Sequence, residues 1–327
     1  MDRGSQGGKY PEELPIYRSA LELGKVSGGV MGSIDPGVCK RKNATAMKID
    51  RPVFIVAPHR SGTTLLYTIL SRHPDVGYFN QANRWLRAFP RLAHLATRCG
   101  MRDRPVEAKA IWDLLWRQED DIMEADDATA DALDWYGRKV ERVLKVRGTS
   151  RFLAKYPRFS LRLGWLDAVF PGCLFVHIVR DWRAVVSSTV VRRNRREDRK
   201  NPNYGGWFGM RIPDWRQLRE LPHEIAAGRQ YRITTQWLEQ KGPAFSNRYL
   251  QVWYGDLCRD PVETVRGIAA FCDLAWSESF EASIPPKREA GNQKWRKVLD
   301  AAMLERIRQE DPEFFERHEE PEEPGKF

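Results

Sequence analysis

The sequence predicts an α/β fold in which helices flank a parallel β-sheet. Short apolar runs of strand length alternate with longer segments of helical spacing, and this alternation favours parallel strands joined by helices. Polar clusters follow several of the apolar runs, as they do at the ligand-binding edge of such sheets. The 327 residues are 42% hydrophobic and 30% charged, a globular composition that excludes collagen-like, coiled-coil and wholly disordered chains.

The predicted strands are apolar runs bounded by Pro, Gly or charged residues. Pro58 ends the first run, Lys155-Tyr156-Pro157 ends the second, and Arg180-Asp181 follows the third. Short continuous apolar runs are typical of strands that are buried on both faces. We expect the strands at residues 53–57, 152–154, 173–179 and 249–254.

Helices are predicted where apolar residues recur at helical spacing. Pro74 stops the first of these segments, and Pro171-Gly172 closes the third. We expect the helices at residues 63–70, 105–146, 161–170, 182–193, 215–241, 262–272 and 295–310.

The chain divides into an arm, one domain and a tail. Residues 1–50 are rich in Gly and polar residues, so we expect an irregular N-terminal arm with one short helix near residues 16–24. The domain spans residues 51–310. Residues 311–327 are acidic and contain Pro, and we expect this C-terminal tail to fray.

The charge balance favours an anionic partner. Lys and Arg outnumber Asp and Glu by 54 to 44, which gives a net charge of +10. A nucleotide, a nucleic acid, a lipid headgroup or an acidic substrate would all fit, and solubility alone is an equally good explanation.

The cysteines and the apolar segments indicate a cytoplasmic protein. The five cysteines show no paired spacing, and Cys173 and Cys272 lie in apolar surroundings typical of buried thiols. No apolar run approaches the ~18 residues of a membrane span. The N-terminus has no apolar region of the kind that secretory signals carry, so we expect neither a transmembrane segment nor secretion.

The segment Ala57–Leu65 has the composition of an anion-binding loop between a strand and a helix. Such a loop offers backbone N–H groups and the positive end of a helix dipole. Gly62 allows a close approach, Ser61, Thr63 and Thr64 add hydroxyls, and Arg60 adds a planar cation. An ordinary capped turn is the simpler alternative. The Walker A order of Gly-Lys-Ser/Thr is missing, which disfavours a magnesium-dependent ATPase or GTPase.

The run Arg60-Ser61-Gly62-Thr63-Thr64-Leu65-Leu66 resembles the 5′-phosphosulfate loop of sulfotransferases that use 3′-phosphoadenosine 5′-phosphosulfate (PAPS). The family usually has Pro just before the cation, where this chain has His59. The resemblance implies a P-loop-NTPase-like sulfotransferase fold for residues 51–310. It also implies PAPS as donor, 3′,5′-adenosine bisphosphate as product, and no metal.

A second anion site is predicted where Arg180 ends a strand and Ser188 lies two turns into the next helix. This spacing resembles the family's 3′-phosphate signature, an Arg followed eight residues later by a Ser. A surface Arg beside an unrelated helix Ser is the alternative. The two signatures occur in the family's order, each on a strand-to-helix turn.

Three further segments extend the resemblance to about residues 52–300. Tyr204, in a Gly- and aromatic-rich loop, is similar to the family's adenine-contacting Tyr. Tyr254-Gly255-Asp256-Leu257 resembles a late structural strand and its following helix. Arg288 is similar to the loop that closes over the 3′-phosphate; the usual Lys-Gly after it is Glu289-Ala290 here, and Lys294 could compensate.

The reacting end needs groups that stabilise the leaving oxygen and remove a proton. Arg60 is the candidate for the charge on the bridging oxygen, and Lys155 resembles the family's second-strand Lys. Relatives place a basic Glu after the first helix or a His after that Lys, but residues 78–84 lack a carboxylate and Tyr156 follows Lys155. His59 is the remaining candidate base, although an ordinary loop histidine is the commoner case. The acceptor-binding candidates are Asn80, Gln81, Arg84, Trp85 and Trp207.

These observations lead to one hypothesis and several alternatives. The hypothesis is a PAPS-dependent sulfotransferase that modifies a hydroxyl or amine of a small molecule, sugar or glycolipid. A nucleotide-dependent phosphotransferase would need a Walker lysine and a metal-binding acid, and neither is evident. A non-catalytic nucleic-acid-binding protein would need basic and aromatic residues on one face, whereas the basic residues here are spread along the chain. A sulfotransferase fold that has lost catalysis is also compatible with the missing base.

Overall fold

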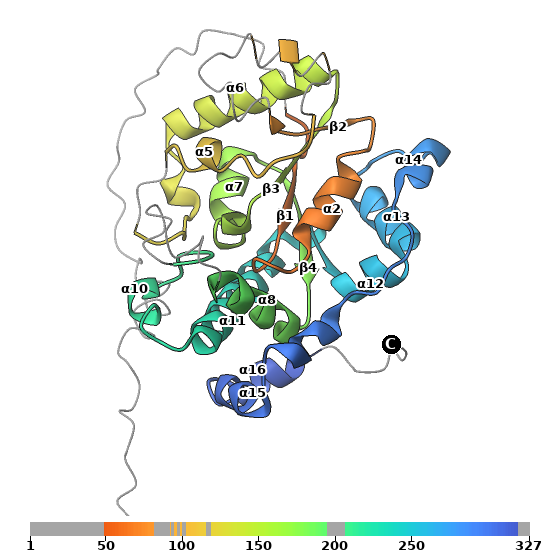
Figure 1. Ribbon diagram of the computed structural model, residues 1–327. Coiled ribbons are helices and arrows are strands. Elements are labelled where there is room, and N and C mark those ends of the chain that lie inside the picture. Colours follow the sequence, from red (N-terminus) through yellow and green to blue (C-terminus); the bar gives the residue numbers. More distant parts are fainter. Residues whose placement is uncertain are drawn as a thin grey trace, which may run out of the picture. The chain divides into compact units, whose positions relative to one another are not determined.

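Five parallel strands form the sheet at the centre of the computed structural model, which describes residues 49–81, 92, 95–96, 99, 103–115, 119–194 and 207–319. Their order is β2-β3-β1-β4-β5, and every neighbouring pair is parallel. The strands are β1 (Val53–Val56), β2 (Val76–Gly77), β3 (Arg151–Lys155), β4 (Leu174–Val179) and β5 (Tyr249–Trp253). Figure 1 shows β1, β3 and β4 side by side. The parallel sheet predicted from the sequence is confirmed.

Helices cover both faces of the sheet, because its central strands are apolar on both sides. Val53 and Ile55 of β1 pack with α2 (Thr63–Leu70) and α13 (Pro261–Phe271). Phe54 and Val56 point to the opposite face and pack with α6 (Ala130–Arg147) and α7 (Leu163–Val169). The helices are α2 (Thr63–Leu70), α5 (Lys109–Trp112), α6 (Ala130–Arg147), α7 (Leu163–Val169), α8 (Trp182–Asn194), α10 (Trp215–Leu218), α11 (His223–Lys241), α12 (Tyr254–Arg259), α13 (Pro261–Phe271), α14 (Glu278–Ser283), α15 (Ala301–Arg308) and α16 (Pro312–Arg317). Short 3-10 helices occur at Ala125–Asp127, Pro157–Leu161, Gly242–Arg248 and Asn292–Lys297.

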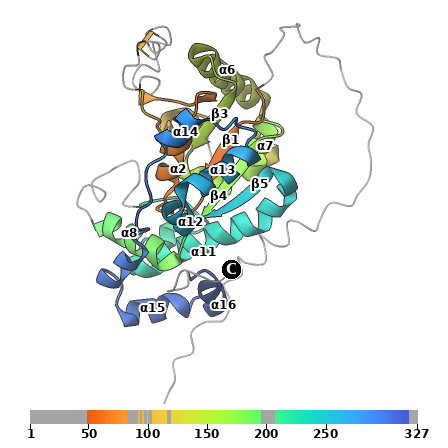
Figure 2. The same cartoon turned by 90° about the vertical axis from the view of Figure 1, so that its right-hand side faces the viewer.

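A third group of helices extends the core beyond the sheet. Helix α8 packs along α11, and α15 and α16 lie against this pair (Figure 2). Phe315 of α16 is fully buried against Trp182 of α8, with ring centroids 4.9 Å apart. The tail predicted from residue 311 therefore begins too early: Pro312–Arg317 is a packed helix, because Phe314 and Phe315 supply an apolar face that the acidic composition obscured.

Three long predicted helices are interrupted. The one over residues 215–241 divides into α10 and α11, with residues 219–222 outside both. In the described part of residues 105–146, the α-helical segments are α5 and α6. Glu124 and Asp127 cap a separate 3-10 turn, and Thr129 caps the start of α6. The predicted helix over 295–310 divides into a 3-10 helix and α15, which begins after the Asp300 cap. The short elements β2, α12 and α14 have no distinct sequence pattern and were not predicted.

The carboxyl ends of three strands meet at one edge of the sheet. Ile55 in β1 is in register with Lys155 in β3 on one side, and Val56 is in register with His177 in β4 on the other. The loop after β1, Lys155 and Arg180 therefore lie near one another. Among the described helices, none is both long and apolar enough to cross a bilayer.

Candidate active site

The loop after β1 has the backbone of an anion cradle. Arg60 and Gly62 both have positive φ, 72° and 93°, so the chain curls before α2 begins at Thr63. Gly62 is the N-cap residue, and its missing side chain matters: a Cβ there would lie 2.2 Å from Cε2 of Tyr254. The buried hydroxyl of Ser61 has no hydrogen-bond partner among the described residues. Both features fit a loop shaped around a bound anion.

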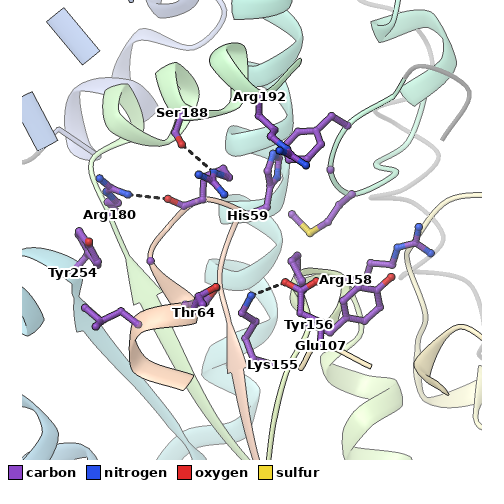
Figure 3. Close-up of a pocket in the computed structure, with 18 of the residues that line it drawn as sticks. His59, Thr64, Glu107, Lys155, Tyr156, Arg158, Arg180, Ser188, Arg192 and Tyr254 are labelled. Atoms are coloured by element: carbon purple, nitrogen blue, oxygen red, sulfur yellow. Dashed lines mark hydrogen bonds and ion pairs between the residues drawn. The ribbon is translucent and has the colours of Figure 1, made fainter. Parts of the chain in front are cut away.

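The two anion segments predicted from the sequence meet directly. The Arg60 Nε donates a hydrogen bond to the Ser188 hydroxyl at 2.9 Å, and the Arg180 guanidinium donates to the Arg60 carbonyl oxygen, also at 2.9 Å (Figure 3). Arg60 and Arg180 are 120 positions apart in sequence, but both line one cavity. The two arginines therefore face a common cleft.

Arg180 is held by the first residue of the 3-10 helix Asn292–Lys297 and by an aromatic ring. Its Nε donates to the Asn292 side-chain oxygen at 2.9 Å, and its guanidinium carbon lies 4.4 Å from the centroid of the Tyr254 ring. Arg288 donates to the Tyr254 hydroxyl at 3.4 Å and lines the same cavity. Two guanidinium groups thus flank Tyr254, which makes this end of the cavity strongly cationic.

The cavity encloses about 600 Å³. Cationic side chains dominate its lining: Arg60, Lys109, Lys155, Arg158, Arg180, Arg192 and Arg288. An apolar group completes the lining and includes Tyr156, Trp207, Phe208 and Met210. Glu107 is the only carboxylate among the described lining residues. The cavity therefore suits an anion that also carries an apolar or aromatic portion.

Lys155 lies at the end of β3, where the sequence predicted it, and it is paired. Its Nζ is 2.6 Å from Oε1 of Glu107 (Figure 3), and Nζ of Lys109 is 3.3 Å from Oε2 of the same carboxylate. Burial favours the protonated form of Glu107, but the two ammonium groups outweigh it and hold the pKa of Glu107 below its usual value. Glu107 is therefore ionised at neutral pH.

His59 lines the cavity but is a weak proton acceptor. Burial, with Arg193, Arg60 and Lys109 adding to it, lowers the pKa of His59 to about 3. Its Nε2 lies 3.3 Å from the Thr189 hydroxyl. These surroundings keep the imidazole neutral and oppose its protonation, so they argue against the predicted role of His59 as general base.

The predicted acceptor residues and lid residues have different outcomes. Asn80 is completely buried and donates to Asp103 at 3.2 Å, so the structure does not bring it to the cavity. Gln81 and the exposed Lys294 are likewise absent from the described lining. Trp207 does line it. Arg84, Trp85 and Tyr204 lie outside the described residues, as does the predicted short helix near residues 16–24.

Sequence reasoning missed several residues of the cavity, among them Glu107, Lys109, Arg158 and Tyr254. Glu107 lies in a segment predicted to be helical, and nothing in the local sequence Val106-Glu107-Ala108 indicates a partner in Lys155. Tyr254 was interpreted as structural, yet its ring contacts Arg180 and fills the space left by Gly62. In the sequence, Gly62 alone indicated that a bulky group packs against the loop at the position of the Tyr254 ring. The predicted buried thiols, Cys173 and Cys272, are confirmed.

Comparison with known proteins identifies a family. The sequence model of the sulfotransferase family matches residues 52–278. The chain is 25% identical over 230 residues to protein-tyrosine sulfotransferase 1 of Danio rerio, covering 69% of this chain and 54% of the relative. It is also 25% identical over 229 residues to the protein-tyrosine sulfotransferase of Drosophila melanogaster, covering 69% of this chain and 39% of the relative. The chain thus spans about half the length of these relatives, or less.

A solved structure supports the fold. The sulfotransferase STF1 from Mycobacterium tuberculosis matches with a TM-score of 0.54 at 17% identity, covering 82% of this chain and 76% of that one. At this identity the similarity concerns the arrangement of strands and helices. It agrees with the parallel sheet and with helices on both of its faces.

Proposed function

Because this chain belongs to the sulfotransferase family, we propose that it transfers the sulfuryl group of PAPS to an acceptor hydroxyl or amine. The observation that carries this proposal is the meeting of the loop Arg60–Thr64 with Arg180 and Ser188 in one cavity. A nucleotide with phosphate groups at both its 5′ and 3′ positions needs two such anion sites at a fixed separation. A nucleic-acid-binding surface would not require two cradles in one pocket.

Each cradle suits one end of the nucleotide. The loop backbone and the start of α2 suit the 5′-phosphosulfate, because a helix N-terminus offers N–H groups and the positive end of the helix dipole to an anion. The predicted Ser61 is fully buried and is not among the described lining residues. Arg180, Ser188 and Arg288 suit the 3′-phosphate, since planar guanidinium groups bind phosphate oxygens in pairs. The cationic lining replaces the charge that a divalent metal supplies in phosphoryl transfer.

We propose that Lys155 acts at the reacting centre. It lies at the carboxyl end of β3, next to the strand that leads into the loop, and only 5% of its side chain is exposed. A buried ammonium group at this position stabilises negative charge more effectively than one in water. The Arg60 side chain is held toward Ser188, so Lys155 is the cation nearer the acceptor side.

The apolar lining indicates the kind of acceptor. Tyr156, Trp207, Phe208 and Met210 provide rings and a thioether against which a sugar face or an aromatic group can pack. We propose a hydroxyl of a small molecule, sugar or glycolipid as acceptor. The phenol of tyrosine is the second candidate, because the rings would accommodate it and relatives carry that substrate in their names.

Calorimetry tests the donor site without knowledge of the acceptor. We expect 3′,5′-adenosine bisphosphate to bind without metal, and Arg180→Ala to weaken this binding about 10- to 100-fold, because hydrogen bonds to charged groups contribute about 1.5–3 kcal/mol. Arg138→Ala is the matched control, because Arg138 lies on α6, is exposed and pairs with Asp134 one turn away. Metal-dependent binding of ATP that is unaffected by Arg180→Ala would refute the proposal.

A further inference from the structure

Glu107 stands out because it is the only carboxylate among the described residues of a cationic cavity. Its side chain is 29% exposed, so it is neither buried in the core nor free in solvent. One oxygen contacts Lys155 and the other contacts Lys109. A carboxylate in such a site is able to accept a proton from a bound molecule if one of these cations moves away.

The segment that carries Glu107 is fixed by the fold. The Val106 N–H donates to the Phe79 carbonyl oxygen at 2.9 Å, and Asn80 pairs with Pro105 in an antiparallel bridge. The Tyr67 hydroxyl of α2 donates to the Val106 carbonyl oxygen at 3.2 Å. Three contacts from two elements therefore hold the residues beside Glu107. Its position in the cavity is a built feature of the fold.

We propose that Glu107 is the general base that removes the proton from the acceptor hydroxyl, and that Lys155 alternates between Glu107 and the transferring group. This inference rests on the proposed sulfuryl transfer and names the residue that the sequence did not supply. It follows from the 2.6 Å contact between Glu107 and Lys155 and from their joint place in the lining. His59 is a poor alternative because its environment opposes protonation.

The proposed step balances as follows. The acceptor O–H bond breaks and its proton passes to a Glu107 oxygen, while the acceptor oxygen forms a new bond to sulfur. The bond from sulfur to the 5′-phosphate oxygen breaks, and its electron pair stays on that oxygen. Lys155 stabilises the charge that develops there. Glu107 later releases its proton to water.

The ion pair couples donor binding to the strength of the base. Groups facing Glu107 are Lys155 from β3, Lys109 at the start of α5, and Tyr67 from α2. With both ammonium groups in place, Glu107 stays ionised and is a weak base. When Lys155 turns to the transferring group, Glu107 loses one of its two stabilising charges and becomes a stronger base. A base in the correct position typically contributes about 10²- to 10⁴-fold to the rate.

The test compares acceptors of different acidity in Glu107→Gln. The probes are phenol, 4-nitrophenol, which ionises near neutral pH, and water, whose acceptance of the sulfuryl group is measured as PAPS hydrolysis. We expect the variant to lose about 10²-fold or more in kcat with phenol and with water, and far less with 4-nitrophenol, which needs no base. Glu263→Gln, on the exposed side of α13, is the matched control.

Binding of 3′,5′-adenosine bisphosphate separates this inference from the proposed function. We expect Glu107→Gln to bind it within about threefold of the unsubstituted chain, which also reports correct folding. Equal losses with both phenols would overturn the inference, because a residue that only positions Lys155 affects every acceptor alike. Bisphosphate binding without turnover of any probe would also overturn it. Failure to bind the bisphosphate in the unsubstituted chain would instead refute the proposed function.

Discussion

Gly62→Ala tests whether the loop Arg60–Thr64 depends on close packing of Gly62 against the Tyr254 ring. Gly62 has a φ of 93°, and the new Cβ would lie 2.2 Å from Cε2 and 2.3 Å from Cδ2 of the Tyr254 ring. The ring cannot move cheaply, because it is 7% exposed, lies under Arg180 and accepts a hydrogen bond from Arg288. We therefore expect the substitution to reduce both stability and nucleotide affinity.

The expected loss has two parts. A non-glycine residue in the left-handed region costs about 1–2 kcal/mol, and overpacking against a fixed ring costs about 1–3 kcal/mol. The free energy of unfolding should therefore fall by about 2–5 kcal/mol in a urea titration. Binding of 3′,5′-adenosine bisphosphate should weaken as well, since displacement of Tyr254 moves the ring on which Arg180 rests.

A double-mutant cycle with Tyr254→Ala isolates the contact. Without the ring, Gly62→Ala should cost only the backbone part, so the two substitutions should couple by about 1–3 kcal/mol. Gly137→Ala on α6 is the control: nothing lies within 4 Å of the added Cβ, and a helical glycine gains about 0.5–1 kcal/mol on becoming alanine. Additive effects in the cycle, or a neutral Gly62→Ala, would refute this account of the loop.

Two further predictions concern stability. His59 and His177 are buried, and burial is the main reason that the pKa of each is lowered to about 3. As the pH falls, the unfolded chain therefore binds protons at these histidines that the folded chain does not bind. The free energy of unfolding should be highest above the unfolded pKa of 6.5 and should fall as the pH drops below it. Each histidine contributes about 1.4 kcal/mol per pH unit to the dependence of the free energy of unfolding on pH. His59→Asn should remove the contribution of one histidine, as measured by urea titrations at about pH 6 and about pH 5. An unchanged pH dependence would contradict the claim that His59 is buried in its neutral form. Phe315→Ala should lower the free energy of unfolding by about 3–5 kcal/mol, because its fully buried ring packs on Trp182. Glu316→Ala, at the exposed neighbouring position, should be nearly neutral. Equal effects of the two substitutions would mean that α16 contributes no packing.

The local parts of the site could be predicted because their signals are contiguous. The loop Arg60–Thr64 and the pair Arg180 and Ser188 each follow a strand and open a helix, and every residue involved lies within one turn or two of its partners. Parallel strands end at the same edge of a sheet, so finding the strands was sufficient to bring these segments together. The residues predicted to bind the acceptor have no such contiguous signal. Asn80, for example, is buried, and its side chain donates a hydrogen bond to Asp103.

The sequence alone determined the parallel sheet, the helices on its two faces and the two cradles, because apolar period and turn chemistry are properties of neighbouring residues. The tertiary structure alone decided that Glu107 meets Lys155 and that Tyr254 fills the space beside Gly62. It also decided that α16 packs on α8. Each of these contacts joins residues far apart in the chain, and their pairing depends on how whole elements pack, which no local pattern records.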